Sequence, residues 1–151
     1  MLAGKQVYLL RNESKRGLGF FEANNFYPDF ILWILDGEKQ YITFIDPKGI
    51  RNLKGLEDDK IQLFKYLQTE VASQLGNAHL MLNSFIISNT PMEQVEFWLQ
   101  KPFEKGEFQK NHVLFKDDKG LSGHNGEYDF AVYVGKKFFY FNATSITLRC
   151  K

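Results

Sequence analysis

Two apolar runs separated by an Asp-Gly pair form the clearest pattern of hydrophobic and polar positions in this chain. The runs cover residues 29–35 and 40–45, with Asp36-Gly37 between them. An Asp-Gly pair in such a setting is a strong indication of a β-hairpin. The first run is apolar at almost every position, which is typical of a strand covered on both faces of its sheet. We therefore expect two antiparallel strands joined at Asp36-Gly37.

The remaining pattern alternates between strands and helices. Apolar residues recur at helical spacing over residues 57–75, with acidic residues in the first turn and Gly76 as a favourable stop. Thr90, Pro91 and Glu93 predict a second helix that ends near Gln100, with Thr90 as its N-cap. Further strands are expected at residues 7–10, 80–88, 112–115, 128–134, 138–141 and 145–148.

Loops account for most of what is left. Residues 12–17 are turn-like, residues 101–111 are polar and loop-like, and residues 19–26 fit either a strand or a short helix. The order of strands, helix, strand, helix and further strands predicts an α/β fold with a mixed central sheet flanked by helices. This order occurs in many unrelated folds, so it does not indicate a function.

Length and composition narrow the class of protein. The chain has 151 residues, 44% of them apolar, and a net charge of +1. This length fits one domain, and the near-neutral charge is not the overall signature of a nucleic-acid-binding protein. Cys150 is the only cysteine, and the chain has neither a phosphate-binding P-loop motif nor an apolar run long enough to span a membrane. We expect a soluble, cytoplasmic protein without membrane partners.

Two carboxylates and one lysine are predicted to meet at one end of the hairpin. Asp29 opens the first strand and Asp46 closes the second, so antiparallel pairing brings both to the same end. Lys48 follows Asp46 by two residues, so on an extended chain the two side chains project to one face. A hard cation such as Mg²⁺ prefers oxygen ligands of this kind, and the lysine could orient a water or stabilise negative charge at phosphorus. The alternative is that both acids merely cap turns at strand ends.

The sequence from Pro28-Asp29 through the hairpin to Asp46-Pro47-Lys48 resembles the motif of PD-(D/E)xK nucleases. The surrounding stretches are similar to the C-terminal nuclease region of DEAD/DEAH-box helicase proteins related to the restriction (Res) subunits of type III restriction–modification systems. These stretches lie between residues 7 and 115 and read VYLLRN, GLGFFEANNFYPDFILWIL, YITFIDPKGIRN, NSFIISNTP and NHVLF.

The resemblance implies a fold and an activity. The fold would be a restriction-endonuclease-like core, and residues 1–151 would form a single nuclease domain. Beyond the region of resemblance, the strands expected at 128–134 and 138–141 predict an extra C-terminal β-hairpin that turns at Gly135-Lys136. The activity would be hydrolysis of DNA phosphodiester bonds with Mg²⁺, or Mn²⁺ in its place, by Asp29, Asp46 and Lys48. The domain would be a fragment of a larger helicase–nuclease, with the ATPase domain elsewhere in the full-length chain and a modification subunit as a partner.

Further site residues are expected around this motif. Glu22 lies where related nucleases often carry a third metal-binding acid. Gln62 and Tyr66 match a Q-x-x-x-Y arrangement on the helix of some relatives. Gln62 is expected to contact nucleic acid, and so are Arg51 and Lys54, which belong to a basic cluster formed by Lys48, Arg51, Lys54, Lys60 and Lys65. The alternative for this cluster is an ordinary solvated face.

Two rival functions remain open at this point. The same fold could serve as a catalytically inactive nucleic-acid-binding accessory domain of a helicase. The presence of Asp29, Asp46 and Lys48 together argues against this, because binding alone makes no chemical demand for all three. Cleavage of RNA or of a repair intermediate is the other rival, because the motif does not distinguish DNA from RNA.

Overall fold

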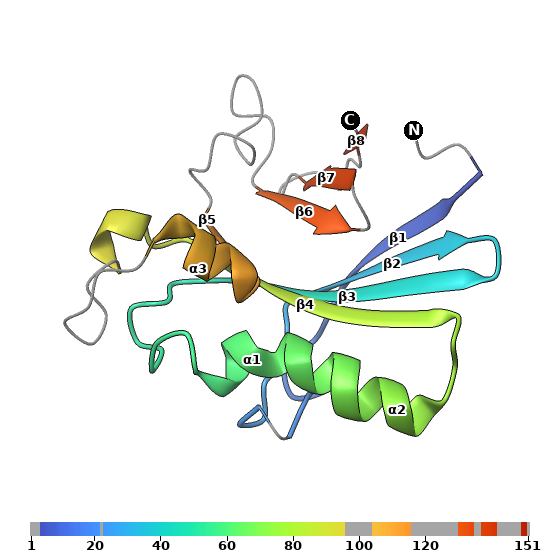
Figure 1. The fold of residues 1–151 in the computed structure, drawn as a ribbon, viewed down its shortest axis with the longest axis horizontal. Coiled ribbons are helices and arrows are strands. Elements are labelled where there is room, and N and C mark those ends of the chain that lie inside the picture. Colours follow the sequence, from blue (N-terminus) through green and yellow to red (C-terminus); the bar gives the residue numbers. More distant parts are fainter. Residues whose placement is uncertain are drawn as a thin grey trace.

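A five-stranded mixed sheet forms the centre of the fold (Figure 1). The computed structural model describes residues 4–21, 23–95, 104–115, 130–134, 137–141 and 149–150. The order across the sheet is β1-β2-β3-β4-β5. The strands are β1 Gln6–Arg11, β2 Phe30–Asp36, β3 Lys39–Lys48, β4 Leu80–Ser88 and β5 Val113–Phe115. The predicted α/β class with a mixed central sheet is confirmed.

The first three strands form an antiparallel meander. β1 pairs with β2 and β2 pairs with β3, in a register that places Phe30 opposite Ile45. The turn between β2 and β3 consists of Gly37 and Glu38, one position beyond the predicted Asp36-Gly37, because Asp36 still pairs with Lys39. Gly37 adopts a left-handed φ of 59° that a residue without a Cβ accepts readily. The sequence therefore located the hairpin turn to within one residue but did not fix its register.

A helical crossover connects β3 to the parallel strand β4. It consists of α1 (Asp59–Tyr66), the π-helical segment η1 (Leu67–Val71) and α2 (Ala72–Leu75). The Asp58 side chain caps its start by accepting from Lys60 N at 3.0 Å, and Gly76 ends it with a φ of 58°. The predicted helix over residues 57–75 is confirmed, apart from the π-helical segment, which the periodicity did not indicate.

Each face of the sheet carries its own apolar cluster. On the face toward α1, the buried residues include Phe44, Ile61, Leu63 and Ile86. The opposite face carries a second cluster, formed by Leu32, Ile34, Ile45, Phe85 and Ile87. Burial on both faces explains why β2 and β4 read as nearly continuous apolar runs.

A second, three-stranded sheet is formed by the C-terminal part of the chain. β6 (Phe130–Val134) pairs antiparallel with β7 (Lys137–Phe141), and β7 pairs antiparallel with β8 (Arg149–Cys150). In Figure 1 this sheet lies on the opposite side of the central sheet from α1 and α2. The turn expected at Gly135-Lys136 and the strand expected at 145–148 lie outside the described residues.

Two predictions between residues 90 and 111 are wrong. Thr90 is not a helix N-cap, because its Oγ1 accepts a hydrogen bond from Ile50 N at 3.2 Å. The segment after it begins with η2, a 3₁₀-helix over Met92–Gln94 without a side-chain cap, and residues 96–100 lie outside the described part.

The second error concerns the expected loop at residues 101–111, which contains the helix α3 (Lys105–Lys110). A capping box between Glu104 and Glu107 starts this helix, and the fully buried Phe108 anchors it. The polar composition of the segment obscured this local signal. No helix within the described ranges is long and apolar enough to cross a membrane.

Candidate active site

The register of the β2–β3 hairpin places Asp29 and Asp46 at the same end of the sheet. Phe30 lies opposite Ile45, and Asp29 and Asp46 are the next residues beyond that pair. Residues directly opposite each other in an antiparallel pair project to the same face. Both acids line one open depression in the surface, so their predicted proximity is confirmed.

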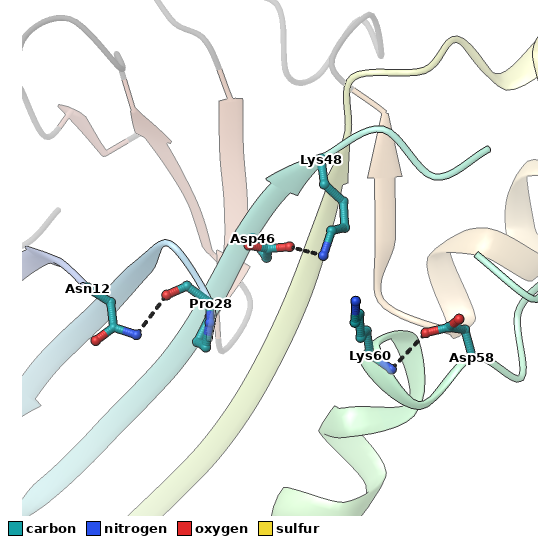
Figure 2. A network of polar contacts seen from close by, with 6 residues as sticks. All are labelled: Asn12, Pro28, Asp46, Lys48, Asp58 and Lys60. Atoms are coloured by element: carbon teal, nitrogen blue, oxygen red, sulfur yellow. Dashed lines mark hydrogen bonds and ion pairs between the residues drawn. The ribbon is translucent and has the colours of Figure 1, made fainter. Parts of the chain in front are cut away.

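The Asp46 carboxylate is buried and paired with Lys48. Its residue is 5% exposed, and Lys48 Nζ lies 2.7 Å from Asp46 Oδ2 (Figure 2). Burial raises the pKa of the Asp46 carboxyl and outweighs the Lys48 ammonium, which lowers it; the charge of Asp29 also raises this pKa. Apart from the Lys48 ammonium, Oδ2 has no hydrogen-bond partner among the described residues. A carboxylate oxygen has two lone pairs, so Asp46 keeps acceptor capacity for a second cation beside Lys48.

Pro47 lies where β3 loses its neighbour on one side. Pairing with β2 stops at Ile45, whereas pairing with β4 continues through Lys48. A proline cannot donate a hydrogen bond, so it is tolerated where the strand is locally an edge. Pro47 therefore lies on a locally unpaired side of β3, where it lines the depression.

The aromatic ring of Phe26 supports the lysine. Lys48 Nζ lies 4.7 Å from the centre of this ring, over its face, in a cation–π contact. Residues 19–26, for which the sequence left strand and helix open, form a turn closed by a bridge between Phe20 and Phe26. Asn24 and Asn25 both have left-handed φ angles, of 56° and 54°, which asparagine tolerates better than most residues. This turn positions the Phe26 ring against Lys48.

Four segments enclose the depression, which has a volume of about 330 Å³. They are the loop after β1, the loop before β2, the end of β3 and the first turn of α1. The lining residues are Ser14, Asn25, Phe26, Tyr27, Asp29, Asp46, Pro47, Lys48 and Lys60. A slightly larger cavity of about 360 Å³ borders Tyr41, Gln68 and Asn83, but no charged side chain lines it. The chemistry of the lining, rather than the volume, identifies the smaller depression as the candidate site.

Asn12 forms hydrogen bonds with the backbone at Pro28 and Asp29 and so fixes the position of Asp29. Its Nδ2 donates to Pro28 O at 2.9 Å, and its backbone N donates to Asp29 O at 2.8 Å (Figure 2). The same side chain also closes its own loop, donating to Leu18 O and accepting from Leu18 N. Asn12 was not among the predicted site residues. Its position directly after a strand and ahead of the Gly17 turn was the sequence feature that could have indicated a loop-closing side chain.

The structure does not bring the expected nucleic-acid contacts into the depression. Gln62 donates to Leu56 O and, at 2.9 Å, to Asn111 Oδ1, and with Tyr66 it borders a separate cavity of about 210 Å³. Arg51 and Lys54 are exposed on the loop between β3 and α1 and do not line the depression. Both donor hydrogens of Gln62 bind protein acceptors, so its side chain has a structural role in the folded chain, and its contact with nucleic acid stays a prediction.

Lys60 lines the depression although it was not among the predicted site residues, and the predicted Glu22 cannot be placed. Glu22 lies outside the described residues. Lys60, which the sequence analysis placed only in a basic cluster, lines the depression. The Asp58 cap, which positions the first turn of α1, was the local signal for the placement of Lys60.

The donor set fits a hard divalent cation that keeps part of its hydration shell. Within the part of the chain that the structure describes, no three His, Cys, Asp or Glu residues form a metal-binding group. Mg²⁺, however, is commonly held by only one or two carboxylates, together with water and substrate phosphates. The remaining acceptor capacity of Asp46 Oδ2 and the exposed Asp29 suit this kind of binding.

No protein-family model, curated protein or solved structure matched this chain in comparison. The case for a function therefore depends on the residues of the depression.

Proposed function

We propose that this chain is a metal-dependent nuclease domain that hydrolyses DNA phosphodiester bonds with Asp29, Asp46 and Lys48. One observation carries the proposal: a buried carboxylate whose inner oxygen has only a lysine ammonium as its partner lies near a second carboxylate, in an open depression. Burying an ionised carboxylate costs free energy unless other charges or hydrogen bonds compensate for it. Burial still raises the pKa of Asp46 despite Lys48, so the site favours an additional cation.

The arrangement of the elements supports the proposal. An antiparallel meander, a helical crossover and a parallel strand are the parts of a restriction-endonuclease-like core, and the site lies at the end of its second and third strands. The proposed fold includes β6 and β7 as an added C-terminal hairpin. This support is an analogy at the level of the fold, and the argument for activity comes from the site.

Asp29 and Asp46 would hold Mg²⁺, or Mn²⁺ in its place, with water and a substrate phosphate completing the coordination. When bound, such an ion lowers the pKa of a water ligand and neutralises charge on the scissile phosphate. Lys48 would donate hydrogen bonds to a phosphate oxygen and stabilise the charge that develops there in the transition state. Phe26 keeps the Lys48 ammonium at the inner wall of the site.

Full-length partners are part of the proposal. The chain would work beside an ATPase motor of the helicase type in the same polypeptide, with a modification subunit that reads the DNA sequence. Glu22 would supply a third carboxylate to the metal.

Cleavage of supercoiled plasmid with Mg²⁺ or Mn²⁺ tests the proposal. We expect the wild type to nick or linearise DNA, and we expect Asp46→Ala and Lys48→Ala each to lower the rate by about 100-fold or more. Asp36→Asn is the matched control, because Asp36 ends β2 at the opposite end of the same hairpin and should leave cleavage intact. A labelled RNA of the same sequence, tested in parallel, distinguishes DNA from RNA substrates.

The other outcomes separate the rival functions. If the wild type does not cleave but binds Mn²⁺ in a manner that Asp46→Ala abolishes, the site is competent and needs its helicase partner. If it binds nucleic acid without metal and without any effect of Asp46→Ala, the inactive accessory domain is the better description. Absence of both cleavage and metal binding would refute the nuclease proposal.

A further inference from the structure

The depression contains a second ammonium group that the proposed chemistry does not use. Lys60 belongs to the first turn of α1, and its side chain extends toward the end of Lys48 (Figure 2). Its direction follows from the helix start, where Asp58 Oδ1 accepts a hydrogen bond from the backbone N of Lys60. The ammonium itself is not used in this cap, so it is free to act in the depression.

One aromatic ring holds both ammonium groups. Lys48 Nζ lies 4.7 Å and Lys60 Nζ 6.0 Å from the centre of the Phe26 ring, and Phe26 is only 5% exposed. The π face of a buried ring attracts cations, so it favours two like charges in the same region. The lining also carries the Asp29 and Asp46 carboxylates, so an anion is attracted only to the immediate surroundings of the two ammonium groups.

The two lysines differ in their counter-ions. Lys48 is paired with Asp46 at 2.7 Å, whereas no carboxylate of the described residues lies within 4.0 Å of Lys60 Nζ. The neighbouring Asp59 accepts a hydrogen bond from Asn24 Nδ2 at 2.6 Å instead. Lys60 is therefore the cation of the depression whose charge is not compensated.

We propose that Lys60 binds a phosphate of the nucleic-acid strand adjacent to the phosphate that is cleaved. This inference rests on the proposed nuclease function and adds a substrate-positioning residue to it. Lysine binds phosphate as a point charge, and contacts to the backbone hold a strand in place without reading its sequence. Ser14 and Asn25 line the same depression and add neutral hydrogen-bonding groups around such a phosphate. Lys60 thus governs binding of the strand, whereas Lys48 governs the chemical step.

The experiment measures how the affinity for labelled DNA depends on salt, by fluorescence anisotropy with EDTA present so that no cleavage occurs. For each phosphate contact with a duplex, the slope of log K against log salt changes by about 0.9. We expect Lys60→Ala to reduce the slope by about 1 and to weaken binding equally for unrelated sequences. Lys60→Arg should restore the wild-type slope, because it keeps the charge.

Lys65→Ala is the matched control. Lys65 lies on the same helix and also makes a cation–π contact, 5.7 Å from the centre of the Phe64 ring, but it does not line the depression. We expect it to bind DNA with the wild-type slope. Lys60→Gln, checked by thermal unfolding, covers the case in which Lys60→Ala folds poorly.

Steady-state cleavage separates this inference from the proposed function. Lys60→Ala should raise KM with little change in kcat, whereas Lys48→Ala should lower kcat. If Lys60→Ala keeps the wild-type salt slope and KM while Asp46→Ala abolishes cleavage, the inference is overturned and the nuclease function stands. If the wild type shows no salt-dependent binding of nucleic acid, the inference is also overturned, and metal binding at Asp46 then tests the nuclease proposal separately.

Discussion

Asp46 and Lys48 form an ion pair along one face of β3, with 2.7 Å between Oδ2 and Nζ. Their side chains are 7% and 23% exposed, so both are largely removed from water. The lysine is thus the counter-ion of the carboxylate in the metal-free protein and, in the proposed mechanism, the group that meets the phosphate. Stability and activity are therefore coupled at this pair, and variants of either residue should be measured for both.

Replacing Asp46 by asparagine should stabilise the metal-free protein. Burial raises the pKa of Asp46 in the folded state above its usual value of 3.8, so the unfolded chain releases this proton first as pH rises. Stability is therefore lost from pH 3.8 up to the raised pKa, and the loss persists at neutral pH. We expect Asp46→Asn to increase the free energy of unfolding in urea at neutral pH with EDTA present.

The same variant should lose its response to metal. Mg²⁺ or Mn²⁺ should raise the melting temperature of the wild type, because a ligand that binds only the folded state stabilises it. Asp46→Asn should show no such rise. A variant that is less stable than the wild type in EDTA, or that is stabilised equally by metal, would contradict the view of Asp46 as a buried metal ligand.

Removing the Asn12 side chain should loosen the backbone that carries Asp29. Its amide makes hydrogen bonds with Leu18 O, Leu18 N and Pro28 O. A typical hydrogen bond contributes about 1 kcal/mol, so we expect Asn12→Ala to destabilise the protein by about 1–3 kcal/mol and to weaken Mn²⁺ binding.

A graded variant checks the role of Asn12. Asn12→Asp keeps the acceptor for Leu18 N but loses both donor hydrogens, so it should fall between the wild type and Asn12→Ala in urea unfolding. Unchanged Mn²⁺ affinity in Asn12→Ala would show that Asp29 does not depend on this clamp.

Gly17→Ala should disturb the same clamp from the other side. A Cβ at this position would overlap Asn12 Oδ1 and would lie 2.9 Å from the backbone N and O of Glu13. Backbone atoms cannot move aside cheaply, so the loop must shift and the Asn12 hydrogen bonds must weaken. We expect reduced stability and reduced cleavage, measured by thermal unfolding and the plasmid assay. Gly106→Ala is the control, because a Cβ there meets no atom within 4 Å.

Acid should destabilise the fold through His112. Its ring is stacked between Phe64 and Phe85, with centroid distances of 3.8 and 4.7 Å, and its Nδ1 lies 3.0 Å from Ser84 O. Burial lowers the pKa of this histidine below its usual 6.5. As pH falls below 6.5, the unfolded chain therefore binds a proton first, so the free energy of unfolding falls until the lowered pKa is reached.

Unfolding in urea across this pH range tests the role of His112. We expect His112→Asn to remove this part of the pH dependence, since asparagine tolerates the left-handed φ of 58° at this position. His79→Asn should retain it, because the His79 side chain is 55% exposed. An equal pH dependence in His112→Asn and the wild type would contradict the assignment.

Local sequence patterns were sufficient to predict the hairpin and the position of its two acids at the same end. The Asp-Gly pair and the flanking apolar runs predicted the hairpin and its acidic end. The observed register, with the turn at Gly37-Glu38, pairs Phe30 with Ile45 and places Asp29 beside Asp46, whereas a two-residue turn at Asp36-Gly37 would have placed Asp29 opposite Phe44. The spacing of Asp46 and Lys48 places both on one face, because side chains alternate along a strand. The end of the long helix at Gly76 could also be predicted locally, because glycine favours the left-handed conformation that ends a helix.

Contacts between segments that are far apart in the sequence could not be predicted from local patterns. Thr90 was expected to cap a helix but accepts a hydrogen bond from Ile50 N, and Gln62 was expected at the site but binds Asn111. Each of these side chains can form hydrogen bonds with many different groups, and the packing of the loops decides which group lies next to it. Asn12 and Phe26 were missed for the same reason, since each acts on a residue well over ten positions away.

The sequence by itself determined the α/β class, the hairpin and the meeting of Asp29, Asp46 and Lys48 at one end of it, because each follows from the turn signal and strand periodicity over a short stretch of chain. Only the tertiary structure decided which residues complete the site. The packing of α1 and of the loop before β2 against the end of β3 brings Lys60 and Phe26 to the carboxylates and leaves Gln62 and Arg51 outside the depression. That packing depends on how the apolar faces of separate elements fit together, which no local pattern specifies.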